Sequence, residues 1–311
     1  MTASLDYPIN IDGHELAVLR GAETDGAPVV FVHGISQSVN IWPLLFPDGT
    51  LDSLNWCSIS LPGHYPSRTP ADFHVGDVTP ELFVNTIART IEAMFGDRKV
   101  HLAGWSTGGF AVLNLAASYP ERFASVLSVA GYAQGRWTGL LGWLQTVAAC
   151  GRVGRFACRR SFVRLGAQAY RFRSSMGLLA SNRNAWRESR LRRPAMDAMF
   201  VDFSQHNKSV IAALFSGIRG FDITDHLSRI TADTLIVHGD SDRIIPVKEA
   251  RRLVDTIKPA QLHILQDCGH MFFAEATDQF ATVFSEWLNR QLPTAEIADG
   301  NESDAPSGDE A

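Results

Sequence analysis

The chain has 311 residues, of which 45% are hydrophobic and 20% are charged, and its formal net charge is −5. This length suits one large α/β domain with an insertion, or two ordinary domains. The composition excludes wholesale disorder, collagen and coiled coil, and the negative net charge argues against an overall nucleic-acid binder.

Apolar and polar side chains alternate weakly over the first 20 residues, around a turn at residues 11–14, which predicts an edge hairpin. Beyond residue 20, short apolar runs bounded by turn residues alternate with helical patterns. Strands are expected at 28–32, 56–60, 100–103, 125–130, 234–237 and 261–265, and helices at 79–95, 107–119, 247–257 and 271–291. Such alternation predicts an α/β fold with a mainly parallel sheet flanked by helices.

The segment 131–225 interrupts this alternation, and its helical pieces do not form strand-plus-crossover units. We therefore expect an inserted helical cap, rich in arginine, between two parts of the core at 1–130 and 226–292. The residues 293–311 contain six acids, no base and little to bury, which predicts a disordered acidic tail.

The N-terminus has no basic region followed by an apolar run, so no secretory signal is expected. The longest charge-free apolar stretch, 137–151, is shorter than the roughly 20 residues that a membrane span needs. Four cysteines, none in a Cys-x-x-Cys pair, indicate neither a disulfide scaffold nor a metal site. A cytoplasmic protein with no metal or other cofactor is the expectation.

The motif Gly-Trp-Ser-Thr-Gly at 104–108 lies between an expected strand and an expected helix. This is the context of a nucleophile elbow, in which glycines permit a tight turn that presents the serine hydroxyl of Ser106. Asp242 follows the strand expected at 234–237, and His270 follows the strand expected at 261–265. The order Ser, Asp, His, each beyond the carboxyl end of a strand, places all three at one edge of a parallel sheet.

With these motifs the chain resembles the α/β-hydrolases over about residues 10–290, apart from the cap. The resemblance implies that Ser106 is the nucleophile and that His270 takes its proton and then delivers it to the leaving group. It implies that Asp242 holds the imidazole and stabilises its charged form. Asp240 is the alternative acid, and its structural role would be to cap the turn.

The sequence His33-Gly34-Ile35 resembles the His-Gly oxyanion loop of the same family. The backbone N–H groups of Ile35 and Thr107 would then face the developing oxyanion. His33 is expected to brace this loop, and His64 to order the turn after the next strand.

The haloalkane dehalogenases and epoxide hydrolases of this fold have aspartate at the elbow. Serine instead predicts an acyl-enzyme, and hence cleavage of an ester, thioester or lactone, as in esterases, lipases and thioesterases. Two other interpretations stay open. The same triad could transfer the acyl group to an alcohol or a peroxide, as in an acyltransferase or perhydrolase, or the chain could be a non-catalytic binding protein of this fold.

The expected cap has fifteen Lys or Arg against five Asp or Glu, a charge of +10, whereas the rest of the chain has −15. Two sets of arginines recur at helical spacing: Arg152, Arg155 and Arg159, and then Arg183, Arg187 and Arg190. Arginine binds phosphate and carboxylate through paired hydrogen bonds. The first set, together with Trp105 of the elbow, therefore supplies candidate substrate-binding residues.

An apolar helical face over 140–148 precedes the first set. An apolar face beside a basic one suits a lid over an acyl chain with an anionic handle. The expected partner is thus a small-molecule ester or acyl thioester. Acyl groups linked to CoA or to a carrier protein are included in this class. Docking on anionic lipid, ordinary core packing and a merely solvated charged face are the alternatives. Nucleic acid is not expected, because no recognition module is present.

Overall fold

The structure is a computed structural model that describes residues 4–46, 49–52 and 54–291. Its strands are β1 (Ser4–Ile11), β2 (His14–Arg20), β3 (Pro28–Val32), β4 (Asn55–Ile59), β5 (Val100–Trp105), β6 (Phe123–Val129), β7 (Asp233–Gly239) and β8 (Ala260–Leu265). They form one sheet in the order β1-β2-β4-β3-β5-β6-β7-β8. Strands β3 to β8 run parallel, and β1 and β2 form an antiparallel hairpin at one edge. The predicted α/β fold is confirmed.

Helices cover both faces of the sheet, which is why its central strands are apolar throughout. All residues of β3 and β5 are buried. Side chains alternate along a strand, so His101 and Gly104 of β5 face opposite sides. A Cβ on Gly104 would meet the backbone of α2 (Thr107–Ser118), whereas the His101 ring contacts Trp287 of α11 (Thr277–Gln291). Helices α2 and α11 thus lie on opposite faces.

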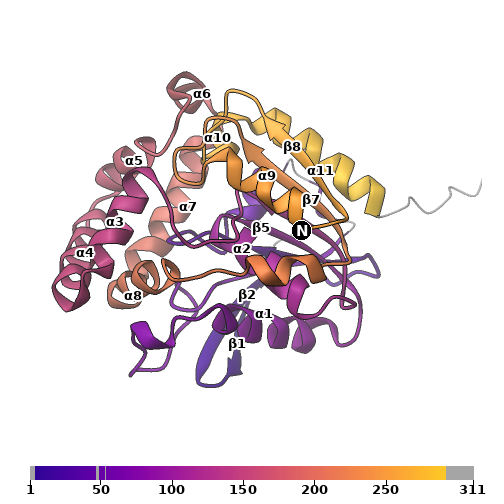
Figure 1. Ribbon diagram of the computed structural model, residues 1–311, viewed down its shortest axis with the longest axis horizontal. Coiled ribbons are helices and arrows are strands. Elements are labelled where there is room, and N and C mark those ends of the chain that lie inside the picture. The colour runs from indigo at the N-terminus through magenta and orange to yellow at the C-terminus, as the bar shows by residue number, and fades with distance from the viewer. Residues whose placement is uncertain (1–3, 47–48, 53, 292–311) are drawn as a thin grey trace, which may run out of the picture.

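The long segment between β6 and β7 is helical, as predicted. It contains α3 (Gly139–Ala149), α4 (Gly151–Gly166), α5 (Ala169–Gly177), α6 (Arg183–Glu188), α7 (Arg192–Gln205) and α8 (Lys208–Ile218). Figure 1 shows these helices gathered on one side of the molecule, apart from α9 (Val247–Thr256) and α11. The limits of this cap at residues 131 and 225 stay a prediction, and the acidic tail predicted at 293–311 lies outside the described residues.

The remaining elements are α1 (Pro80–Phe95), α10 (Phe272–Glu275) and three short 3-10 helices, η1 (Trp42–Leu45), η2 (Val75–Asp77) and η3 (Thr224–Arg229). One expected helix differs from the prediction, because 271–291 is divided between α10 and α11. At the break, Ala276 has φ −145° and ψ 43°, outside the helical region. Among the described helices, none combines the length and the hydropathy that crossing a bilayer requires.

The chain changes direction across the sheet beside β3. Strand β3 pairs with β4 on one side and with β5 on the other, after which the sequence proceeds outward through β6, β7 and β8. In open α/β sheets, sites form beyond the carboxyl ends of the strands at such a reversal. A site is therefore expected among the segments that follow β3, β5, β7 and β8.

Candidate active site

Ser106 lies in a strained turn between β5 and α2. Its backbone has φ 56° and ψ −114°, a region that residues with a side chain rarely adopt. The turn needs glycine on both sides, because a Cβ on Gly104 would lie 2.3 Å from the Gly108 carbonyl oxygen. A Cβ on Gly108 would lie 2.2 Å from that of Val32. The tight crossing of β5 and α2 thus presents the hydroxyl at the edge of the sheet, as the motif predicted.

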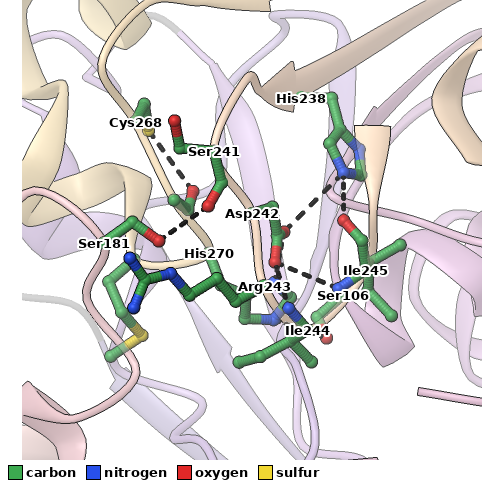
Figure 2. A network of polar contacts seen from close by, with 12 residues as sticks. Ser106, Ser181, His238, Ser241, Asp242, Arg243, Ile244, Ile245, Cys268 and His270 are labelled. Carbon is green, nitrogen blue, oxygen red and sulfur yellow. Dashed lines mark hydrogen bonds and ion pairs between the residues drawn. The ribbon is translucent and has the colours of Figure 1, made fainter. Parts of the chain in front are cut away.

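Three side chains from distant segments form one chain of hydrogen bonds (Figure 2). The Ser106 hydroxyl lies 3.0 Å from Nε2 of His270, and Nδ1 of His270 lies 2.7 Å from Oδ2 of Asp242. A carboxylate at Nδ1 requires the proton on that nitrogen, so Nε2 is left as an acceptor for the hydroxyl of Ser106. All three side chains are buried.

Asp242 is held as a carboxylate by several donors. Its Oδ1 accepts hydrogen bonds from the backbone N–H groups of Ile244 and Ile245, at 2.8 and 3.0 Å. Burial by itself raises the pKa of Asp242, but His270 and the backbone donors outweigh it and the net pKa lies below the ordinary value. Nε2 of the buried His238 ring lies 3.7 Å from Oδ2 of Asp242 and donates a hydrogen bond to the Ile245 carbonyl oxygen (Figure 2).

Asp240, the alternative acid, has other partners. Its two carboxylate oxygens accept hydrogen bonds from the backbone N–H groups of Asp267 and Cys268, at 3.1 and 3.0 Å. These bonds join the turn after β7 to the turn before His270. The structure thus brings Asp242, and not Asp240, to the imidazole.

The loop after β3 lies against the serine. A Cβ on Gly34 would be 3.2 Å from Cβ of Ser106. Within the described part of the chain, the N–H groups of Ile35 and Thr107 have no hydrogen-bond acceptor, and Thr107 begins α2, where the helix dipole is positive. Both donors are therefore free to bind a negatively charged oxygen beside Ser106.

Three buried histidines, His33, His64 and His206, support this loop; we call them the histidine ladder. Successive ring centroids are 5.0 Å apart. In each ring one nitrogen faces a backbone N–H and the other a backbone carbonyl oxygen. One nitrogen must then accept and one donate, so each ring is neutral.

Burial accounts for the same state in energetic terms. It lowers the pKa of His33 to about 4 and holds the pKa values of His64 and His206 well below the ordinary value. The ladder accepts from the Ser36 N–H and donates to the Gln37 carbonyl oxygen, and so orders the loop that contains Ile35. Sequence analysis predicted bracing roles for His33 and His64. The part of His206 was missed, because it lies 141 residues beyond its partner Tyr65.

An apolar cavity of about 200 Å³ opens beside the same loop. Ile35, Ser36 and Gln37 form one end of it. The cap supplies the remaining wall, including Leu141, Leu144, Phe162, Met176, Leu179 and Phe203. The apolar face predicted over 140–148 thus contributes to a cavity next to the loop that contains Ile35.

Glu275 joins the cap to the segment around His270. Its buried carboxylate accepts four backbone hydrogen bonds, from Ser181 (2.8 Å), Asn182 (2.6 Å), Gly269 (3.2 Å) and Met271 (3.1 Å). The Ser181 hydroxyl also donates to the Ser241 carbonyl oxygen, next to Asp242 (Figure 2). Sequence analysis missed Glu275, although a lone acid in the apolar run after His270 was a signal.

A second contact anchors the cap on the other side of the site. The buried carboxylate of Asp202, on α7, accepts from the Ser38 hydroxyl and, at 3.1 Å, from the Asn40 side-chain amide. Burial raises the pKa of Asp202, and these two hydrogen bonds oppose the rise. The cap is thus joined to the loops that flank Ser106 on both sides.

Comparison with known proteins agrees with this geometry. The family profile described as the alpha/beta hydrolase fold matches residues 27–277. The chain belongs to the α/β-hydrolase family. Among curated relatives, a 2-hydroxy-6-oxo-2,4-heptadienoate hydrolase of Pseudomonas putida is 27% identical over 90% of this chain and 98% of its own length. A 2-hydroxymuconate semialdehyde hydrolase of a Pseudomonas species is 26% identical, over 85% of this chain and 87% of its own.

Solved structures share the fold of this α/β-hydrolase. An esterase from Thermogutta terrifontis superposes with a TM-score of 0.70 at 20% identity, over 94% of this chain and 100% of its own. The enol-lactonase of Burkholderia xenovorans gives a TM-score of 0.71 at 17% identity, over 91% and 100% of the two chains. At these identities the likeness concerns the fold alone.

The remaining candidates of this α/β-hydrolase lie apart from the cavity. The Trp105 ring is fully buried and packs against His270, Phe272 and Phe273. Arg152, Arg155 and Arg159 lie along α4 and do not line the apolar cavity. Their roles in substrate binding stay predictions. Within the described residues, no group of three or more His, Cys, Asp or Glu side chains is arranged to hold a metal ion.

Proposed function

We propose that the protein is a serine hydrolase that cleaves a carboxylic ester or thioester through an acyl-enzyme on Ser106. The observation that supports this most is the chain of hydrogen bonds from Ser106 to His270 (3.0 Å) and from His270 to Asp242 (2.7 Å). This chain of hydrogen bonds ends on Ser106, which lies in a strained turn. The side-chain and backbone groups around the serine are already oriented for nucleophilic attack.

The reaction proceeds in two halves. The Ser106 oxygen attacks the acyl carbon while its proton passes to Nε2 of His270, and the carbonyl oxygen gains the charge that the N–H groups of Ile35 and Thr107 receive. His270 then gives this proton to the leaving alcohol or thiol, and the acyl group remains bound to Ser106 as the acyl-enzyme. Water then attacks with His270 as base, and the acid departs from Ser106. Asp242 stays ionised throughout and stabilises the imidazolium.

The apolar cavity supports an acyl group of moderate size. Its lining includes Ile35, one residue beyond the glycine that lies against Ser106, and in this proposal it receives the acyl chain bound to Ser106. An apolar protein cavity of roughly 150 Å³ holds a benzene ring. A cavity of about 200 Å³ therefore suits an acyl chain of about six to eight carbons.

A second candidate function follows from the curated relatives. A 2-hydroxy-6-oxo-dienoate contains a carboxylate, an enol and a ketone but no ester, so its hydrolysis must break a carbon–carbon bond next to the ketone. The similarity to the Pseudomonas putida enzyme over 90% of this chain favours this chemistry as the alternative.

One panel of substrates separates the two candidates. Hydrolysis of p-nitrophenyl esters with acyl chains of two to sixteen carbons is measured beside the loss of the conjugated absorbance of 2-hydroxy-6-oxo-2,4-heptadienoate. Wild-type protein and the Ser106→Ala variant are compared. We expect ester turnover that needs Ser106 and is greatest at about six to eight carbons. Loss of the dienoate without ester turnover would establish the second candidate, and product partition with an added alcohol would reveal acyl transfer.

A further inference from the structure

One hollow of the cap is lined by arginines. It has a volume of about 540 Å³, within the range of small-molecule sites, and lies between α5, α6 and α7. We call it the arginine cleft, after Arg173, Arg183, Arg187, Arg192 and Arg193, and no acidic residue lines it. Figure 1 shows α5, α6 and α7 on the side of the molecule where the cap lies.

Few of these charges are neutralised within the described part of the chain. Asp197 accepts a paired hydrogen bond from Arg173 and lies 3.8 Å from Arg193. Arg187 donates to the neutral Asn184 side chain, and neither Arg183 nor Arg192 has an acceptor among the described residues. Asp197 thus offsets Arg173 and Arg193, and the other three guanidinium groups have no carboxylate partner among the described residues.

The arrangement is unfavourable for the helices that contain it. Arg192 and Arg193 occupy the first turn of α7, whose N-terminus is the positive end of its dipole, and that turn contains no acid and no side-chain cap. Like charges so close together raise the free energy of the empty protein. An anion bound among them would lower it, since arginines and helix N-termini both bind phosphate.

The arginine cleft and the apolar cavity are neighbours in the cap. Leu178 lines both. A ligand that extends past Leu178 would have its charged group among the arginines and its apolar chain in the cavity lined by Ile35.

We propose that the arginine cleft is a phosphate-binding site that holds the multiply charged head of the substrate. The part of this inference that concerns the substrate rests on the proposed function, whereas anion binding itself does not. A soluble acyl thioester with a phosphorylated carrier and a phospholipid ester both present this chemistry.

Binding is tested first, in protein that cannot turn over. Pyrophosphate and coenzyme A are titrated into the Ser106→Ala protein by calorimetry at low ionic strength. Replacement of Arg183 and Arg192 by Gln in that background removes two charges that no described carboxylate neutralises, and we expect it to weaken binding at least about tenfold. Replacement of Arg160 and Arg164 by Gln removes the same charge from exposed positions on α4, outside the cleft, and should change the affinity less than twofold.

Equal losses in the two double variants would overturn the inference, because binding would then reflect the general charge of the cap. It would also be overturned if neither pyrophosphate nor coenzyme A bound measurably to the Ser106→Ala protein with all its arginines in place. Both results are independent of ester hydrolysis, so the proposed function can fail while the phosphate site stands.

Activity then identifies the source of the phosphate. With Ser106 restored, the Arg183→Gln/Arg192→Gln variant should show a KM for acyl-CoA raised about tenfold or more, and an unchanged KM for neutral p-nitrophenyl esters of the same chain length. If vesicles of anionic phospholipid, and not acyl-CoA, show the variant's loss of activity, the head group is that of a lipid. A variant that lost activity equally on neutral esters would contradict a site for the anionic head.

Discussion

The two aspartates after β7 differ in what they contact. Asp242 accepts a hydrogen bond from Nδ1 of His270 at 2.7 Å, whereas Asp240 accepts hydrogen bonds from two backbone N–H groups of the neighbouring turn. Removal of the charge at Asp242 leaves the imidazole without the acceptor that holds its tautomer. The same change at Asp240 only weakens a turn.

We therefore expect Asp242→Asn to lower kcat by about 10⁴-fold. Asp240→Asn should lower kcat by less than about tenfold. Both variants are compared in ester hydrolysis after circular dichroism has shown that they are folded. The opposite ranking would transfer the acid's role to Asp240.

The histidine ladder makes stability depend on pH. Burial lowers the pKa of His33 to about 4, below the value near 6.5 that it has in the unfolded chain. Between these values the unfolded state binds more protons, so stability is complete above pH 6.5 and is lost as pH falls toward 4. The expected loss from this group is about 1.4 kcal/mol per pH unit in that window.

Urea unfolding at several pH values between 7 and 4.5 measures this slope. In the His33→Gln variant, which keeps one donor and one acceptor, the slope should decrease by that amount. His226→Gln, at an exposed position, serves as the control and should leave the slope unchanged. A slope unaltered by the loss of His33 would show that His33 is not held neutral. The other two members of the ladder, His64 and His206, also have lowered pKa values, and Lys208 contributes to the lowering at His206. The free energy of unfolding of the variant should therefore still rise with pH.

At the scale of elements, one carboxylate joins three segments of the protein. Glu275 of α10 accepts from the cap at Ser181 and Asn182 and from both neighbours of His270. The amides of Gly269 and Met271 are buried with it and have no ready alternative partner, and those of Ser181 and Asn182 are partly buried. The position of His270 and the position of the cap thus depend on the same side chain.

Replacement by glutamine keeps the size of the side chain but puts a donor NH₂ against one of these N–H groups. We expect Glu275→Gln to lower the free energy of unfolding by about 2 kcal/mol, measured by urea denaturation. Glu286→Gln, on the exposed side of α11, makes the same chemical change and should have an effect within about 0.5 kcal/mol. A Glu275 variant as stable as this control would exclude the structural role assigned here.

The wall that α3 gives to the apolar cavity can be altered separately. Leu144→Trp adds bulk at a half-buried lining position and should shift the preferred acyl chain to fewer carbons. Val153→Trp, at a position on α4 that is 80% exposed, is the matched control and should leave the preference as it is. The ratio of kcat/KM for octanoyl and butyryl esters measures the shift. An unchanged ratio in Leu144→Trp would place the acyl chain elsewhere.

At the scale of the whole molecule, the sequence was sufficient to predict the sheet and to bring three side chains to one edge of it. Parallel strands buried on both faces form continuous apolar runs, and their carboxyl ends share one edge. Ser106, Asp242 and His270 could therefore be brought together from spacing and from a family resemblance. The glycines around Ser106 were readable because only they permit the turn.

Contacts between the cap and the core could not be predicted in this way. Glu275 meets Ser181 across 94 residues, and the angle between cap helices decides which arginines line a cleft. Helical spacing alone favoured Arg152, Arg155 and Arg159, yet periodicity says only that residues share a face. The packing of α5, α6 and α7 brings Arg173, Arg192 and Arg193 to Arg183 and Arg187.

The proposed function depends above all on Ser106 being a nucleophile activated by His270. A fluorophosphonate probe followed by mass spectrometry of the labelled peptide tests it without knowledge of the substrate. We expect one adduct, on Ser106, formed rapidly in the wild-type protein, at least about 10³-fold more slowly in His270→Ala, and not at all in Ser106→Ala. Label on another residue, or no label in the folded wild-type protein, would contradict the account.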